Sequence, residues 1–260
     1  MEPCPFSIVS YHRLPERNLL DKLCQTLLDR GFVLEEDNPE LIIVFGGDGS
    51  FLKAVHDHDG KGKYVLINTG HLGFFSDYSL EEIPEFLQDV LEKDPSIESL
   101  PFLSYLSQRE ESLALSDVVV QADKTVDISV YLNDRLLCET KASGIVIGTP
   151  VASTAYLGSL GSPAIINATD VYQYALIAPV RNSLYLNPVD KAILSRDDVL
   201  EIEVSGGKAA LYLDGIRKTE AISETFRVGF LSSRRLKLAH FRENDNFRRI
   251  LRSVSGIKEE

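Results

Sequence analysis

A glycine-rich turn carries the first residues of this chain that could do chemistry. The segment Gly46-Gly47-Asp48-Gly49-Ser50 follows an apolar run at residues 41–45, typical of a buried parallel strand, and precedes residues 51–55, which look helical. Glycines let backbone N–H groups approach a ligand closely, and the start of a helix attracts anions. A carboxylate here repels phosphate unless it binds Mg²⁺ or takes a proton from an attacking hydroxyl, so Asp48 indicates phosphate-handling chemistry. The alternative is a tight turn with a solvated aspartate.

Three further segments place polar and glycine residues directly after apolar runs. The loop Asn68-Thr69-Gly70-His71-Leu72-Gly73-Phe74-Phe75 follows the run at 64–67, and Asp214-Gly215 follows the run at 209–213. Between them in the sequence, Thr149-Pro150 follows the run at 145–147 and leads to Ser153-Thr154-Ala155-Tyr156. We expect a helix to begin near Ser153, where hydroxyl groups would cap it and its first turn could meet phosphate or ribose.

Roughly the first 95 residues alternate between predicted strands and predicted helices. Apolar runs at 6–10, 41–45 and 64–67 predict strands, leucines at 19–28 recur at helical spacing, and Gly31 is a plausible helix stop. Ser79 and Glu82 form a capping box ahead of a second amphipathic helix. This alternation predicts an open parallel α/β sheet, with both glycine loops at the carboxyl ends of its strands, where ligands bind.

From residue 99 to about residue 240 the pattern changes to short β-rich runs. Asn133-Asp134 and Gly206-Gly207 are interpreted as hairpin turns between pairs of strands, so this part predicts a mostly antiparallel, β-sandwich-like domain. We expect an α/β domain at 1–97, a β-rich domain at 98–240 and a C-terminal helix at 241–260 that packs back on the first domain. The predicted strands of the second domain are 114–120, 126–132, 136–138, 145–147, 174–178, 199–204, 209–213, 227–230 and 236–240.

Composition and charge restrict the classes of function. The 260 residues are 44% hydrophobic and 25% charged, as in an ordinary globular protein, and the net charge of -12 argues against non-specific binding of nucleic acid or of an anionic membrane. Cys4, Cys24 and Cys138 lack the spacing of a metal site or a disulfide framework. We recognise no signal peptide and no apolar stretch of the ~18 residues that a membrane span needs, so we expect a cytoplasmic protein.

Taken in order, the motifs resemble a known family. Gly46-Gly47-Asp48-Gly49, Asn68-x-Gly70-x-Leu72-Gly73-Phe74, Thr149-Pro150-x-x-Ser153-Thr154-Ala155-Tyr156 and Asp214-Gly215 are similar to the motif set of the NAD kinases, especially the short bacterial members. The first motif also occurs in ATP-dependent phosphofructokinases and in lipid kinases. This chain lacks the Thr-Ile-Asp-Asn-Asp segment of the former and the Pro-x-Gly-Thr-x-Asn segment of the latter.

The resemblance implies an α/β domain and a β-sandwich-like domain with NAD bound between them. It implies transfer of the γ-phosphoryl group of ATP to the 2′-hydroxyl of the adenosine ribose of NAD, with Asp48 orienting or deprotonating that hydroxyl. Mg²⁺ would be held mainly by the donor phosphates, and a homotetramer would form in which Tyr185 reaches a neighbouring subunit's site. The implied binding residues are Gly46, Gly47, Gly49, Lys53, Asn68, Gly70, Leu72, Gly73, Phe74, Ser116, Asp117, Lys141, Ser143, Ser153, Thr154, Ala155, Tyr156, Ser159, Tyr185, Asp214 and Gly215.

Three departures from the family pattern lie on the NAD side. Most members have Asn-Glu, Gly-Asp-Gly and Thr-Pro-Thr/Ser-Gly where this chain has Ser116-Asp117, Ala142-Ser143-Gly144 and Thr149-Pro150-Val151-Ala152. Two alternatives therefore stay open: a related kinase with another hydroxyl substrate, such as a lipid or a different nucleotide, and a nucleotide-binding regulator. Retention of Asp48 argues against the regulator, because a mere binding site does not need a carboxylate beside phosphate.

Overall fold

The chain divides into two compact units, Met1–Leu100 together with Arg235–Glu260, and Pro101–Arg234. The structure, a computed structural model, describes residues 4–11, 17–70, 73–108, 110–182, 189–222, 224–243, 247 and 249–251. Each unit has a sheet and a hydrophobic core of its own. None of the described helices has the length and apolar character needed to cross a membrane.

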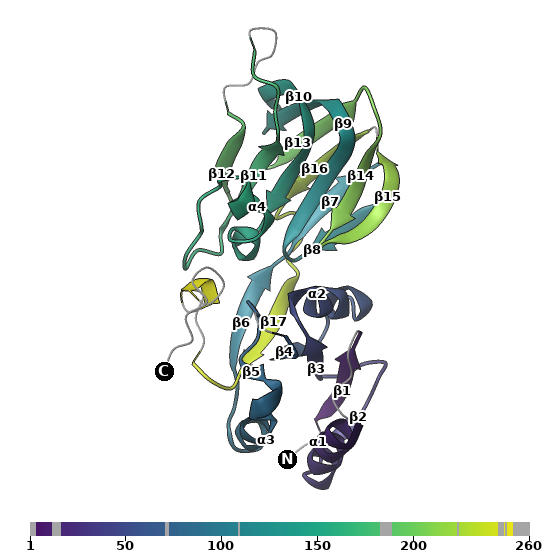
Figure 1. The fold of residues 1–260 in the computed structure, drawn as a ribbon, viewed down its shortest axis with the longest axis vertical. Coiled ribbons are helices and arrows are strands. Elements are labelled where there is room, and N and C mark those ends of the chain that lie inside the picture. Colours follow the sequence, from purple (N-terminus) through teal and green to yellow (C-terminus); the bar gives the residue numbers. More distant parts are fainter. Residues whose placement is uncertain are drawn as a thin grey trace. The chain divides into compact units, whose positions relative to one another are not determined.

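The first unit is built on a mostly parallel sheet, as the alternation of strands and helices predicts (Figure 1). Strand β3 is apolar throughout because it is buried on both faces between β1 and β4, and it pairs with both in parallel. Within the described residues the order is β2-β1-β3-β4-β17-β6, with β5 beside β4. The strands are β1 (Pro5–Ser10), β2 (Val33–Leu34), β3 (Leu41–Gly46), β4 (Lys63–Asn68), β5 (Tyr78–Ser79), β6 (Ser96–Pro101) and β17 (Arg235–His240).

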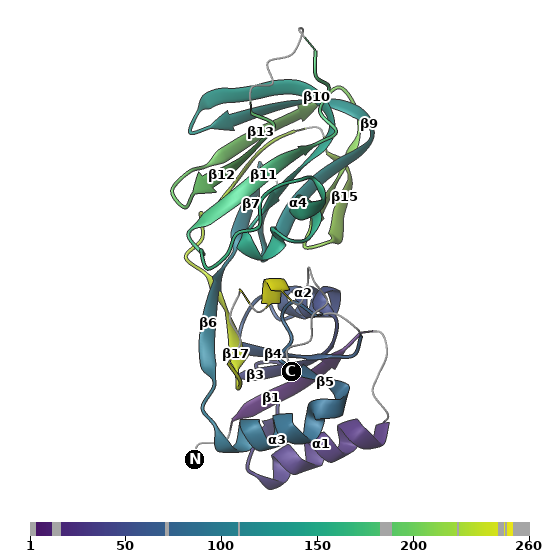
Figure 2. The same ribbon diagram turned by 60° about the vertical axis from the view of Figure 1, so that its left-hand side comes forward.

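Helices cover both faces of this sheet (Figure 2). Helices α1 (Arg17–Asp29) and α3 (Ile83–Glu92) share one core with β1, β3 and β4, and α1 ends ahead of Gly31, which has a φ of 88°. The predicted capping box is confirmed: Ser79 and Glu82 cap the short helix η1 (Leu80–Glu82) that leads into α3. On the other face lies α2 (Asp48–Asp57), whose Phe51 stacks on Phe75 with ring centroids 4.4 Å apart.

The second unit is an antiparallel β structure, so the predicted combination of fold classes is confirmed. The long strands β9 and β10 form its spine, because β9 is long enough to pair with β10 on one side and with both β13 and β14 on the other. Two short helices, η2 (Pro150–Ala152) and α4 (Tyr156–Ser159), follow β10. The strands are β7 (Leu103–Ser107), β8 (Glu111–Ala114), β9 (Asp117–Leu132), β10 (Arg135–Gly148), β11 (Val171–Ile177), β12 (Lys191–Ser195), β13 (Leu200–Ser205), β14 (Ala209–Leu213), β15 (Ile216–Ile222) and β16 (Thr225–Gly229).

One predicted hairpin turn is confirmed and one is wrong. Asn133 and Asp134 have φ values of 49° and 64° and join β9 to β10, as a two-residue turn requires. Gly206 and Gly207 instead join β13 to β14, which pair with successive stretches of β9 and not with each other in the described sheet. A glycine is favoured at Gly206 because its φ of 75° lies in the left-handed region, which other residues adopt with strain.

The predicted strand at 114–120 is interrupted. Strand β8 ends at Ala114 and β9 begins at Asp117, because the backbone N–H groups of Leu115 and Ser116 donate to the carboxylate of Asp214 instead of to a neighbouring strand. That carboxylate comes from nearly a hundred residues further along the chain, so the local pattern of apolar residues carries no sign of the interruption.

Strand β17 is a correction to the predicted second domain at 98–240. Its residues pair in parallel with β4, with Lys237 opposite Lys63, and Ala239 joins the core of the first unit. Its apolar alternation fits either sheet, so sequence alone could not assign it. The predicted C-terminal helix falls partly outside the described residues; Phe247, Arg249, Ile250 and Leu251 are helical.

Candidate active site

The two glycine-bearing loops of the first unit lie side by side, as expected for the carboxyl ends of neighbouring parallel strands. Gly46 at the end of β3 pairs with Asn68 at the end of β4, and the N–H of Thr69 donates to the carbonyl oxygen of Gly46 over 3.3 Å. Gly46 has a φ of 153°, and a Cβ there would lie 2.3 Å from Oγ of Ser50. A side chain at Gly46 would therefore push the start of α2 away from the sheet.

The carboxylate of Asp48 connects these two loops. Asp48 is the first residue of α2, and its oxygens accept the backbone N–H of Phe74 over 2.9 and 3.0 Å and that of Phe75 over 3.1 Å. A Cβ at Gly73 would lie 2.4 Å from Oγ of Ser76 in the same loop, so the tight turn of this loop favours glycine. The side chain that sequence analysis assigns to chemistry is thus held in one orientation by the backbone of the second loop.

The start of α2 has the form of an anion-binding site. Its N-cap residue, Gly47, makes no side-chain cap, and Gly49 in the first turn is exposed. First-turn N–H groups of a helix attract phosphate oxygens. In the second loop, the N–H of Gly70 donates to the side-chain oxygen of Asn68 over 3.0 Å, and the expected residue Leu72 lies outside the described residues.

Lys53 is not brought to these loops. Its amine lies 2.9 Å from the carboxylate of Asp57 and 4.4 Å from the ring centroid of Tyr11, whose hydroxyl donates to the same carboxylate over 2.6 Å. Asp57 is one helical turn further along α2, so the ammonium group of Lys53 is directed away from the start of the helix.

In the second unit, Asp214 gathers three of the predicted segments. Its carboxylate accepts the backbone N–H of Leu115 over 2.8 Å, of Ser116 over 2.6 Å and of Asp117 over 3.1 Å. The hydroxyl of Thr149 donates to the carbonyl oxygen of Leu115 over 2.7 Å. With φ values of 52° and 74°, Asp214 and Gly215 form the two-residue turn of the β14–β15 hairpin.

Asp117 is the acidic group whose titration this arrangement changes most clearly. Burial, and secondly the charge of Asp214, raise the pKa of Asp117 to about 7. At neutral pH its carboxyl group is therefore divided between a protonated form that can donate a hydrogen bond and an ionised form that only accepts. Such a group can bind a hydroxyl or an amide of a ligand.

The predicted helix after Thr149 is shorter than expected. Ala155, with a φ of -94° and a ψ of -120°, separates η2 from α4, so the helix begins at Tyr156 and not at Ser153. The Ser153 hydroxyl is buried and accepts the N–H of Ile165 over 3.0 Å, a structural contact and not a cap. Among the other expected binding residues of this segment, Ala155 and Ser159 are exposed, Thr154 is half-buried, and Tyr156 packs against the cluster formed by Val119, Val146, Ala152, Leu157 and Ala175.

Lys141 and Ser143 lie elsewhere on β10. Lys141 pairs with Asp127 over 2.9 Å, and the β9–β10 register shifts between Ala142 and Gly144, which leaves Ser143 at a bulge. Ala142 is fully buried in the core of the second unit. Tyr185 lies outside the described residues, so its contact with a neighbouring subunit and the homotetramer stay predictions.

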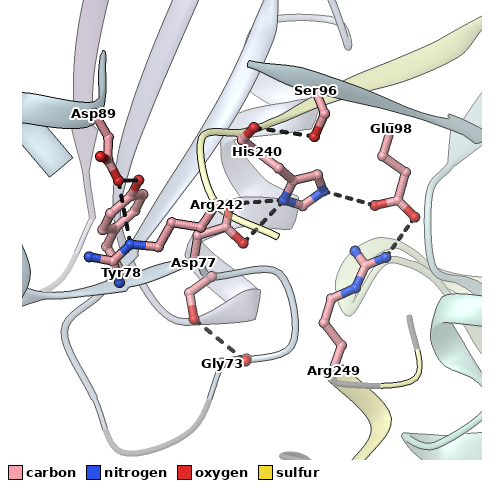
Figure 3. A network of polar contacts seen from close by, with 10 residues as sticks. Gly73, Asp77, Tyr78, Asp89, Ser96, Glu98, His240, Arg242 and Arg249 are labelled. Carbon is pink, nitrogen blue, oxygen red and sulfur yellow. Dashed lines mark hydrogen bonds and ion pairs between the residues drawn. The ribbon is translucent and has the colours of Figure 1, made fainter. Parts of the chain in front are cut away.

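The first unit also contains a buried polar network that no motif in the sequence predicts (Figure 3). His240, at the end of β17, is 4% exposed and donates to Asp77 over 2.8 Å and to Glu98 over 3.1 Å. Burial alone would lower the pKa of His240, but these two carboxylates raise it to about 9, so the imidazole is charged at neutral pH. Glu98 also accepts a hydrogen bond from Arg249 over 2.6 Å. No sequence signal could have found this network, because Asp77, Glu98 and His240 are separated by long stretches of chain.

The sequence of this chain is similar to those of known NAD kinases. A family model described as the ATP-NAD kinase N-terminal domain matches residues 24–95. An NAD kinase of Finegoldia magna is 32% identical over 183 residues, 67% of each chain, and one of Lactobacillus gasseri is 28% identical over 203 residues, 74% of this chain and 76% of the relative.

Two solved structures share the fold. A crystal structure of an NAD kinase from Archaeoglobus fulgidus in complex with ATP covers 98% of this chain and 100% of its own, with a TM-score of 0.79 at 19% identity. A yeast NADH kinase complexed with NADH covers 100% of this chain and 89% of its own, with a TM-score of 0.82 at 15% identity. The chain is 32% identical to the Finegoldia magna NAD kinase across two thirds of both chains, and its fold is that of the solved NAD kinase. The chain therefore belongs to the NAD kinase family.

Proposed function

We propose that this protein transfers the γ-phosphoryl group of ATP to the 2′-hydroxyl of the adenosine ribose of NAD and so forms NADP. The observation that carries the proposal is the position of Asp48 between two glycine loops at the start of α2, with its carboxylate held by the N–H groups of Phe74 and Phe75. Family membership supports the choice of substrates, since the relatives are named NAD kinases and one solved structure holds ATP.

Each part of this arrangement has a role in the proposed reaction. The glycines and the start of α2 hold the donor phosphates through backbone N–H groups. Asp48 orients the ribose hydroxyl and accepts its proton, the hydroxyl oxygen forms a bond to the γ-phosphorus, and the bond to the bridging oxygen breaks to release ADP. Phosphoryl transfer depends chiefly on positioning and charge neutralisation, so a rigidly held carboxylate suits it.

Magnesium enters the proposal as part of the substrate Mg-ATP. Among the described residues, no group of three or more His, Cys, Asp or Glu side chains could hold a metal ion. A cation held by the donor phosphates neutralises negative charge on them.

The second unit supplies the groups that we assign to NAD. Residues of β9 alternate between the two faces of the sheet, and Val118 and Val120 belong to the main core, so Asp117 lies on the opposite face with Val119. Tyr156 packs against the cluster that contains Val119, so it lies on that same face. The altered residues Ser116, Ser143 and Val151 belong to this unit, so another hydroxyl substrate would be selected here and not at the phosphate loops.

A coupled assay for NADP formation from NAD and Mg-ATP tests the proposal. We expect turnover with NAD, and none when Asp48 is replaced by Asn. Parallel reactions with NADH, other nucleosides and a diacylglycerol identify a different acceptor, and polyphosphate in place of ATP identifies a different donor. Phosphorylation of another hydroxyl without any NADP would overturn the substrate assignment, and binding of nucleotides without phosphoryl transfer to any acceptor would indicate a regulator.

A further inference from the structure

Arg249 is a buried arginine whose hydrogen-bonding groups are only partly used. Its side chain is 1% exposed, and one terminal nitrogen, Nη2, donates to Glu98 over 2.6 Å. Its Nε and Nη1 have no hydrogen-bond partner within the part of the chain that the structure describes. In Figure 3, Glu98 lies on one side of the guanidinium group, and the segment that carries Gly73 and Asp77 lies on the other.

A buried guanidinium group with unpaired N–H groups indicates a missing acceptor. Leaving such donors unpaired away from water is unfavourable, and a charged guanidinium group donates strong hydrogen bonds to phosphate or carboxylate oxygens. The network does not lack negative charge, because the two positive charges of protonated His240 and Arg249 are matched by the two carboxylates of Asp77 and Glu98. What Arg249 lacks is hydrogen-bond acceptors. A ligand can supply them, and when no ligand is bound the charge of Arg249 is still matched by Glu98.

The position of Arg249 identifies the chemistry of that ligand. Its guanidinium carbon lies 5.2 Å from the ring centroid of Phe74, and the N–H of Phe74 binds the carboxylate of Asp48. Arg249 thus lies next to the loop that connects to the glycine-rich turn, inside the same unit. We take an anion held at the start of α2 and at this loop as the source of these oxygen acceptors.

We propose that Arg249 is a phosphate-binding residue, whose unpaired Nη1–H donates to an oxygen of a phosphate group of the nucleotide donor. Glu98 positions the guanidinium group, and His240 in turn positions Glu98, since His240 donates to Glu98 over 3.1 Å. The identity of the donor rests on the proposed function; the binding of a polyanionic phosphate by Arg249 does not.

Binding of inorganic tripolyphosphate tests the proposal without turnover. We expect tripolyphosphate to raise the thermal unfolding temperature of the unmodified protein. Arg249→Lys keeps the charge but loses the planar group that presents Nη1–H while Nη2 binds Glu98, and we expect it to bind tripolyphosphate about 10–100-fold more weakly, the ratio that corresponds to losing charge-assisted hydrogen bonds. Arg242→Lys is the matched control, because Arg242 already has Glu82 at 2.6 Å and packs over the ring of Tyr78.

Steady-state kinetics separates the donor from the acceptor. We expect Arg249→Lys to raise KM for ATP at least tenfold while KM for NAD stays within twofold. A rise in KM for NAD alone would assign the residue to the acceptor's pyrophosphate and overturn the assignment to the donor. A folded Arg249→Lys protein with the tripolyphosphate affinity of the Arg242→Lys control would show that Arg249 is purely structural.

A measurement on the unmodified protein covers the case in which Arg249→Lys does not fold. The Nε–H resonance of Arg249, assigned through its proximity to the ring protons of Phe74, should shift on addition of tripolyphosphate, and an unchanged resonance would overturn the proposal. The two proposals fail separately. Tripolyphosphate binding through Arg249 without any NADP formation would support the phosphate site and overturn the proposed reaction. NADP formation with an Arg249 resonance that does not respond to tripolyphosphate would support the reaction and overturn the phosphate site.

Discussion

An Asp-Gly pair follows a strand in each unit of this molecule, and the two pairs differ in exposure and in their surroundings. Asp48 and Asp214 each use a carboxylate to hold backbone N–H groups of a neighbouring loop. Asp214 is 6% exposed, has a φ of 52° and lies in a hairpin turn. Asp48 is more exposed and begins a helix between two glycine loops. The two carboxylates therefore make similar hydrogen bonds, but Asp214 is buried and Asp48 is accessible to a ligand.

A buried carboxylate clamp and an accessible one differ in what their hydrogen bonds contribute. A buried carboxylate with three N–H donors contributes mainly to stability, because its loss leaves those donors without water. A carboxylate that holds backbone N–H groups at an accessible position contributes less to stability, since water can replace it as the acceptor. Its fixed orientation is then available for chemistry. Asp48 and Asp214 should accordingly respond to the same substitution in opposite ways.

The largest expected effect is on turnover in Asp48→Asn. The amide keeps the size of the side chain but cannot accept the proton of the hydroxyl, and its NH₂ group would face the N–H of Phe74 or Phe75. We expect NADP formation to fall about 10²–10⁴-fold. Asp57→Asn, at the opposite end of α2, removes a carboxylate from the same helix and should keep its rate. More than about a tenth of the original rate in Asp48→Asn would exclude this aspartate from the mechanism.

The next effect is on stability in Asp214→Asn. One amide oxygen cannot replace a carboxylate that accepts three backbone N–H groups, and the buried donors left unpaired should lower the free energy of unfolding by about 1–3 kcal/mol. Urea unfolding of this variant beside Asp48→Asn measures the difference. Equal losses of stability in the two variants would contradict the distinction between a buried clamp and an accessible one.

The smallest effect concerns the pH dependence of stability through Asp117. Because the pKa of Asp117 is raised to about 7 in the folded protein, the folded state holds its proton more tightly than the unfolded state. The free energy of unfolding should therefore fall as pH rises from about 4 to about 7. Asp117→Asn removes this dependence, so its stability relative to the unmodified protein should increase by about 1 kcal/mol between pH 5 and pH 8, after allowance for partial exposure.

Urea unfolding at these two pH values, with Asp127→Asn as the control on the same strand, measures that difference. The side chain of Asp127 is 44% exposed and pairs with Lys141, so its removal should not reproduce the effect. Asp214→Asn should weaken it, because the charge of Asp214 is the second cause of the shift. A pH dependence that is identical in Asp117→Asn and in the unmodified protein would show that Asp117 titrates normally.

Local sequence determined the elements that surround the candidate site. Apolar runs defined β3 and β4, the capping box of Ser79 and Glu82 marked the entry to α3, and the glycine-rich turn predicted a loop at the carboxyl end of β3. These features are readable because the hydrogen bonds and the burial that decide them involve residues close in the chain. The parallel sheet followed from the alternation of strands and helices, and both glycine loops then had to meet at one edge.

Tertiary structure decided everything that depends on distant partners. It assigned β17 to the first sheet, joined Asp48 to Phe74 and Phe75, interrupted the strand before Asp117 with the carboxylate of Asp214, and placed His240 and Arg249 around Glu98. Each of these contacts joins residues that are dozens to more than a hundred positions apart. A buried carboxylate, imidazolium or guanidinium group is stable only with such partners, so its role appears only once the packed fold brings them together.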